Sequence, residues 1–118
     1  MPYCRSFVQR AMIAGKEVRP TMYGTIARLR PKPERLADLV AYGRRISGLR
    51  VPGYRASYLF SPAVNPYPEE TAFLVAIFDD EESYRANADS PEQNERYLEL
   101  REMLLADPDW MDGTFASG

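Results

Sequence analysis

The spacing of apolar and polar residues changes along this chain, and the first regular stretch predicts a strand. Between residues 21 and 30, Tyr23, Thr25, Ala27 and Leu29 alternate with Gly, Ile and Arg residues. Such alternation is typical of a strand whose two faces differ in polarity. Proline residues at positions 31 and 33 then end the strand.

A helix is predicted to follow, with Pro33 as its first residue and Glu34 in its first turn, where an acid is favourable. We expect Gly48 to end this helix in a left-handed conformation. The apolar residues between them recur at helical spacing and should face the sheet; they are Leu36, Leu39, Val40, Gly43 and Ile46.

The next strand is predicted after a turn at residues 52–53. In this strand Tyr54, Ala56, Tyr58 and Phe60 should share one face, because side chains alternate between the faces of a sheet. Three proline residues between positions 61 and 70 predict a long, stiff loop after it. Loops of this kind often border a pocket.

The third strand, residues 71–78, is apolar on both faces, with Phe73, Val75 and Ile77 on one of them. Helices cover only one face in the architecture that emerges here, and the second face of an antiparallel sheet is normally polar. We therefore predict that an identical subunit covers this face. Burial at about 25 cal/mol per Å² would contribute several kcal/mol to the association, before its entropic cost.

Two helices and a last strand complete the pattern. Asp79 or Asp80 is expected to cap a short helix that ends near Ala88. Ser90 with Pro91 then predicts a second start.

In this second helix Gln93 would complete a capping box with Ser90. Its inward face should consist of Tyr97, Leu100, Met103 and Leu104. A short strand from Trp110 to about Phe115 comes last. The order strand, helix, strand, strand, helix, helix, strand predicts an α+β fold, a ferredoxin-like sandwich with a four-stranded antiparallel sheet.

Composition excludes several classes of function. The chain has 118 residues, a formal net charge of -2 and no histidine. Without imidazole it cannot form Ser-His or Cys-His catalytic pairs, His-ligated zinc or a proximal haem ligand. Its charge does not favour nucleic acid, and no apolar run approaches the ~20 residues that span a bilayer. The single cysteine, Cys4, fits a reducing compartment, so we expect a cytoplasmic protein.

The N-terminal segment differs from the rest of the chain. Residues 1–20 carry four basic residues and one acid, whereas the remainder is acidic on balance. We expect a poorly ordered basic tail or an over-extended gene start, followed by one ferredoxin-like domain over residues 21–118. A basic targeting peptide is the alternative for the tail.

Four phrases of the sequence resemble a known family, the antibiotic biosynthesis monooxygenase-like domains of the dimeric α/β-barrel superfamily. They are Met22–Thr25, Pro52–Tyr54, Phe78–Ser83 and Asp107–Trp110. The resemblance implies a homodimer in which two sheets pair as an α/β barrel. It also implies oxygenation of an aromatic small molecule without flavin, metal or other cofactor.

A haem-degrading branch of the same superfamily fits poorly. That branch carries an asparagine on the first strand, a tryptophan on the short helix and a histidine on the long helix. At the corresponding positions this chain has Ile26 or Ala27, Asn87 and Tyr97. None of the three matches, so haem degradation is disfavoured.

Six residues are candidates for chemistry on a phenolic substrate. Asn87 and Tyr97 could donate hydrogen bonds to a reacting oxygen, and Arg28 could anchor an anion. Tyr58, Trp110 and Tyr23 could form pocket walls.

Simpler roles stay open for most of them. Asn87 could merely end its helix, the aromatic residues could be core, and Arg28 could pair with an acid at the dimer edge. A non-catalytic module that binds small molecules, or a purely structural dimer, is the alternative to an enzyme.

Overall fold

The computed structural model describes residues 22–116 and confirms the predicted element order. The elements are β1 (Met22–Leu29), α2 (Leu36–Ile46), β2 (Tyr54–Phe60), β3 (Ala72–Phe78), α3 (Glu81–Ala88), α4 (Pro91–Glu102) and β4 (Asp109–Phe115). This is the ferredoxin-like α+β arrangement. The predictions for the basic N-terminal segment lie outside the described residues.

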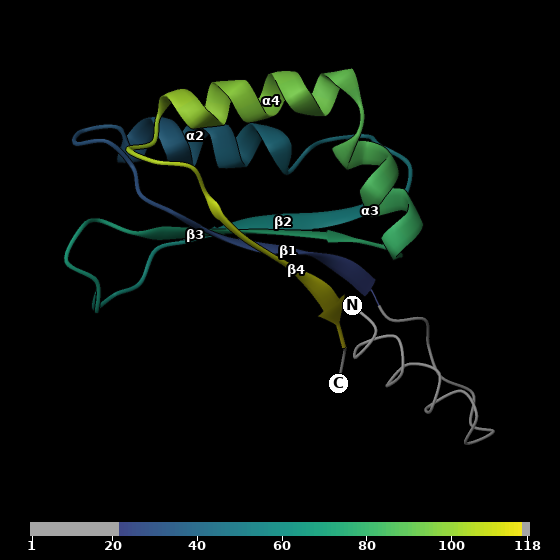
Figure 1. Ribbon diagram of the computed structural model, residues 1–118, viewed down its shortest axis with the longest axis horizontal. Helices are drawn as coiled ribbons and strands as arrows, with labels where there is room; N and C mark the ends of the chain where they lie inside the picture. Colours follow the sequence, from purple (N-terminus) through teal and green to yellow (C-terminus); the bar gives the residue numbers. More distant parts are fainter. Residues whose placement is uncertain (1–21, 117–118) are drawn as a thin grey trace.

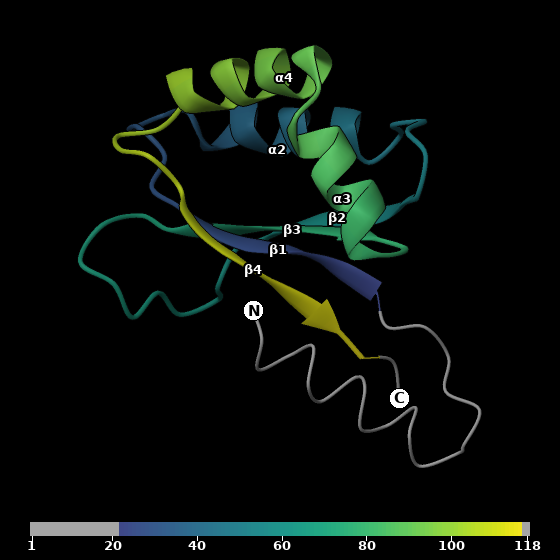
Figure 2. The same ribbon diagram turned by 45° about the vertical axis from the view of Figure 1, so that its right-hand side comes forward.

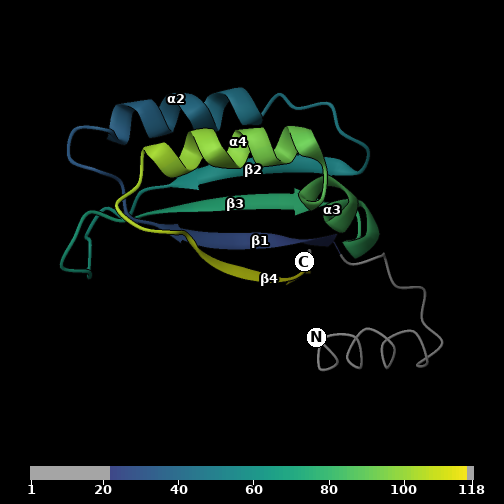
Figure 3. The same ribbon diagram turned by 45° about the horizontal axis from the view of Figure 1, so that its top comes forward.

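The four strands form one antiparallel sheet in the order β2-β3-β1-β4, which Figure 3 shows from the helix side. Helices α2, α3 and α4 lie on the same face of the sheet (Figures 1 and 2). The face with helices is called the covered face below, and the opposite face is called the open face.

Both predicted helix starts after β3 are confirmed by their caps. The Asp80 carboxylate accepts a hydrogen bond from the backbone N–H of Ser83 at 2.8 Å. The Ser90 hydroxyl accepts one from the backbone N–H of Gln93 at 3.1 Å, with Pro91 as the first helical residue. Each contact satisfies an N–H group that the helix itself leaves without a partner.

The predicted start of α2 is wrong, and so is the left-handed conformation predicted for Gly48. Pro33 and Glu34 form a turn, and Glu34 has a φ of 67°, so the helix begins only at Leu36. At the other end the backbone N–H of Gly48 bonds the carbonyl of Arg45 while Ser47 stays right-handed. These bonds satisfy the helix end without a left-handed Gly48.

The predicted face of Tyr54 is also wrong. Strand β2 pairs with β3 through a register shift between Tyr54 and Ala56, a β-bulge that moves the first residue of the strand to the other face. The Tyr54 hydroxyl therefore lies 2.7 Å from that of Ser57. Tyr58 and Phe60 remain on the open face.

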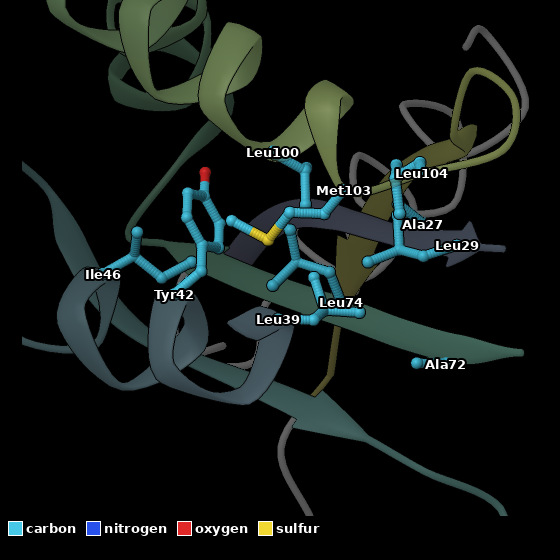
Figure 4. Packing of buried hydrophobic residues seen from close by; sticks show 10 residues of the cluster. All are labelled: Ala27, Leu29, Leu39, Tyr42, Ile46, Ala72, Leu74, Leu100, Met103 and Leu104. Carbon is cyan, nitrogen blue, oxygen red and sulfur yellow. The ribbon is translucent and has the colours of Figure 1, made fainter. Parts of the chain in front are cut away.

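The core fills the space between the covered face and the two long helices. Figure 4 shows its buried side chains, and α2 contributes Leu39, Tyr42 and Ile46. From α4 and the residues after it come Leu100, Met103 and Leu104, as the helical spacing predicts. These residues pack on Ala27, Leu29, Ala72 and Leu74 of the sheet.

The open face is apolar as well. In the single chain Tyr58 is 62% exposed, Phe60 56% and Met111 64%, while Phe73 and Val75 are half-buried. None of the helices between residues 22 and 116 is long and apolar enough to cross a membrane.

Candidate functional site

A cavity of about 430 Å³ lies between the covered face and the three helices. Most of its wall is apolar or aromatic, and its larger side chains are Tyr42, Phe78, Tyr84, Tyr97, Leu100 and Trp110. A concave site of this volume with a few convergent polar groups is typical of small-molecule binding. The cavity is therefore the candidate functional site.

The sheet forms the cavity floor, and strand register gives the floor two unlike rows. One row runs across the four strands through Ser57, Ala76, Thr25 and Asp112, so it is largely polar. The row beside it contains Leu74 and Trp110 and is apolar. A flat ligand on this floor would meet polar groups along one edge.

Asp112 is the carboxylate of the floor. Its Oδ1 accepts a hydrogen bond from the Tyr84 hydroxyl at 2.9 Å, and its Oδ2 lies 4.0 Å from the Arg85 guanidinium. Burial, followed by the hydrogen bond to Asp112, raises the pKa of Tyr84, so Tyr84 remains a neutral donor at physiological pH. Arg85 is shared with Glu81, whose Oε2 lies 3.3 Å from the Arg85 Nε.

Arg96, on α4, is the cationic residue of the cavity wall. Its Nε donates to Gln93 Oε1 at 3.0 Å and its Nη2 to Asn87 Oδ1 at 3.1 Å. Asn87 Nδ2 also lies 3.3 Å from Gln93 Oε1, which closes a small network. Both acceptors of the Arg96 guanidinium are neutral amide oxygens.

Two aromatic side chains form another wall. The rings of Tyr97 and Trp110 lie 6.3 Å apart between centroids, tilted by 44°. Trp110 is 46% exposed, so it stands at an edge of the cavity rather than in the core. The structure thus brings together Asn87, Tyr97 and Trp110 of the six predicted site residues.

The prediction that Arg28 and Tyr58 line the same pocket is wrong. Both side chains belong to the open face, because Arg28 pairs in register with Phe73 and Tyr58 with Val75. Arg28 donates to Glu69 at 2.8 Å and lies 3.9 Å from the ring centroid of Tyr67, so its charge is neutralised within the chain. The pairing with an acid that the sequence left open is the one observed.

Tyr23 lies on the covered face beside the cavity, outside its lining. Its ring packs edge-on against Tyr84 at 5.4 Å, and its hydroxyl accepts a hydrogen bond from Arg85 at 3.2 Å. Burial raises its pKa. Tyr23 thus supports the residue that bonds Asp112.

The lining residues that the sequence did not indicate as site candidates include Tyr84, Gln93, Arg96 and Asp112. Arg96 follows Gln93 by three positions and precedes Leu100 by four, a spacing that puts it on the inward side of α4. Asp112 follows Trp110 by two positions in β4 and so shares its face. In both cases a charged residue occupies a position whose spacing predicts an inward-facing side chain, and this could have identified it from the sequence. Over residues 22–116, no group of His, Cys, Asp and Glu residues is arranged to hold a metal ion.

No protein-family model matches the chain, and no curated protein matches its sequence. Solved structures match in fold. A protein from Chloroflexus aurantiacus described as a "putative antibiotic biosynthesis monooxygenase" superposes with a TM-score of 0.61 at 21% identity, over 82% of this chain and 95% of that one.

Two other structures give a similar result. A protein from Bordetella bronchiseptica with the same description has a TM-score of 0.65 at 20% identity, over 82% of this chain and 99% of that one. A "dimeric ferredoxin-like protein of unknown function" from Thermobifida fusca has a TM-score of 0.60 at 17% identity, covering 86% and 95%. At these identities the likeness establishes the ferredoxin-like fold.

Proposed function

We propose that this chain is a cofactor-independent monooxygenase that oxidises an electron-rich aromatic small molecule, of the phenol type, in the cavity beneath its helices. The observation that carries the proposal is the cavity itself, which joins aromatic walls to a few fixed donors and one carboxylate. The descriptions of the Chloroflexus and Bordetella proteins support the same reaction class.

The chemistry asks little of the protein beyond binding and proton transfer. For an anthrone, one oxygen atom of O₂ becomes the new carbonyl of a quinone and the other leaves as water, so the substrate supplies all the electrons. The protein must bind the ring, favour its anion and accept a proton. Asp112 on the floor is the proton acceptor in this proposal, and Tyr97 is a donor to the substrate oxygen.

The proposal includes a homodimer joined through the open face. Its support is the apolar character of that face in the single chain, together with the dimeric description of the Thermobifida protein. Burying such side chains contributes about 25 cal/mol per Å².

Oxygen uptake with a panel of hydroquinones and anthrones tests the enzyme. We expect uptake above the uncatalysed rate, reduced about tenfold or more by Tyr97→Phe, because a positioned donor contributes at least that much. Asn87→Ala should also reduce uptake, because its amide holds Arg96 and Gln93 in the cavity wall. Tyr58→Phe is the matched control, since the same atom is removed from the open face.

Two other outcomes would contradict the enzyme. No uptake above the uncatalysed rate with any member of the panel removes the proposal for this substrate class. Saturable binding of the same compounds without uptake would replace it with a ligand-binding module that uses the same cavity.

A further inference from the structure

The charges of the cavity are unequally balanced. Among its lining residues only Arg96 and Asp112 are charged. Asp112 accepts from Tyr84 and lies near Arg85, a cation outside the cavity lining. Arg96 has no carboxylate within 4.0 Å in the described part of the chain. Arg85 also pairs with Glu81, at 3.3 Å. Arg96 is therefore the cavity cation that has no ion-pair partner in the described part of the chain.

The position of the Arg96 guanidinium is fixed nonetheless. Asn87 Oδ1 and Gln93 Oε1 accept from Nη2 and Nε, and these two amides also contact each other. Only one of the two hydrogen bonds of the predicted capping box is present. The backbone N–H of Gln93 donates to Ser90, whereas the Gln93 side chain accepts from Arg96. A guanidinium has five N–H donors, so donors remain for a ligand.

We infer that Arg96 is an anion-binding residue and that the cavity selects aromatic ligands in which a ring oxygen is ionised, a phenolate or enolate. The inference rests on the proposed function for the place of the reacting oxygen. Asn87 and Gln93 are positioning residues: they orient the guanidinium through neutral acceptors and leave its charge for the ligand. A carboxylate in their place would consume that charge.

The comparison with Arg28 strengthens the assignment. Arg28 also lies on an apolar surface, yet its partner is the Glu69 carboxylate at 2.8 Å and its guanidinium stacks on Tyr67. The chain thus supplies an acid to the arginine of the open face and two amides to the arginine of the cavity. Opposite charges attract strongly in a partly buried site, so Arg96 would bind an anionic oxygen in preference to a neutral one.

Binding of a matched pair of probes tests this in anaerobic buffer, where no turnover occurs. The probes are 4-nitro-1-naphthol, ionised in mildly alkaline buffer, and the neutral 4-nitro-1-naphthylamine, compared by calorimetry. We expect the wild type to prefer the naphtholate by about tenfold, the range of a hydrogen bond to a charged group. Equal affinity for the two probes would overturn the inference.

Variants of Arg96 test whether this residue causes the preference for the naphtholate. Arg96→Met keeps an apolar stem of similar length, so we expect about a tenfold loss for the naphtholate with the naphthylamine changed less than about twofold. Arg96→Lys should retain part of the preference, because the charge stays. Arg44→Met, on the exposed side of α2, changes the net charge equally and should alter neither affinity. Loss of both probes in a folded Arg96→Met protein would assign Arg96 a packing role instead.

Asn87→Asp separates a positioning role from a merely structural one. This variant adds the absent carboxylate beside Arg96 without removing any atom of the guanidinium. We expect about a tenfold weaker naphtholate complex, an unchanged naphthylamine complex and an unfolding midpoint close to that of the wild type. Unchanged naphtholate binding would contradict the inference.

The outcome is distinct from that of the oxygen-uptake test. Anion preference without oxygen consumption would keep the inference and remove the enzyme. A third probe, 4-nitro-1-naphthoate, distinguishes the kinds of anion: tighter binding of this carboxylate than of the naphtholate would overturn the assignment to ring oxygens.

Discussion

The two faces of the sheet are both apolar, but the helices cover only one of them. On β3, Leu74 is 6% exposed beneath the helices, whereas Val75, the next residue, is half-buried on the open face of the single chain. Hydrophobicity alone does not separate them. The difference shows that alternate positions of one strand can be equally apolar and yet differ in burial. The proposed dimer would bury the positions that the fold of one chain leaves accessible.

The faces also treat a cation differently. On the open face Arg28 bonds Glu69, and its Nε is buried without an acceptor among the described residues. On the covered face Arg96 is held by Asn87 and Gln93, which leave its charge intact. An arginine on an apolar surface therefore indicates an anion site only where its protein partners are neutral.

The largest expected effect on stability comes from a substitution on the covered face. Leu74→Ala should lower the free energy of unfolding by about 2–5 kcal/mol, because it removes buried side-chain atoms and leaves a cavity. Val75→Ala should cost less than about 1.5 kcal/mol in the monomer, since part of this side chain already meets water. Urea denaturation at low protein concentration measures both. Equal losses would show that the two faces contribute alike to the fold of one chain.

The next largest effect on stability concerns two glycines that pair in register between β1 and β4. A Cβ on Gly24 would lie 1.8 Å from the backbone oxygen of Ala76, whereas one on Gly113, its register partner, would meet nothing within 4 Å. We expect Gly24→Ala to cost about 3 kcal/mol, the upper range for overpacking, since a strand backbone must move. Gly113→Ala should be neutral or stabilising by about 0.5 kcal/mol. Thermal unfolding of both variants checks the contrast, which similar midpoints would refute.

A charge introduced at the centre of the open face tests whether this face joins two chains. We expect the wild type to be dimeric at micromolar concentration and Val75→Asp to weaken the dimer by about 30-fold or more, because the dimer would bury an unpaired carboxylate. Light scattering over a dilution series measures this. Glu82→Gln, on exposed α3, is a control that should leave the dimer unchanged. A monomeric wild type would remove the proposed interface.

The fold was largely predictable from local chemistry. The caps at Asp80 and Ser90 and the two apolar faces of β3 follow from rules that act within a few residues. The bulge near Tyr54 and the left-handed Glu34 did not follow, because strand pairing and the entry of α2 decide them. Long-range contacts are not visible in a local pattern.

The site was predictable only in part, for a related reason. Asn87, Tyr97 and Trp110 were found because they lie on inward faces that periodicity identifies. Arg96 was missed because a charged residue in a helix is ordinarily assigned to solvent. Only the packing of α3 against α4 brings Asn87 to its guanidinium, nine positions away in the chain.

The smallest effect concerns Tyr42, whose hydroxyl donates to the backbone carbonyl of Arg96 at 3.1 Å. Burial, followed by the charge of Glu99, raises the pKa of Tyr42 to about 12, from an ordinary value of about 10. The native state thus keeps this proton while the unfolded chain releases it. Stability from this group is complete below about pH 10 and declines between pH 10 and about 12.

Tyr42→Phe should therefore cost about 1 kcal/mol at neutral pH through the lost hydrogen bond. It should also make the alkaline decline of the unfolding free energy shallower, by up to about 1.4 kcal/mol per pH unit. Urea denaturation at pH values on both sides of 10 measures the slopes. If Tyr42→Phe left the alkaline slope unchanged, the covered face would not be protecting this tyrosine from ionisation, and the contrast between the two faces would hold for packing alone.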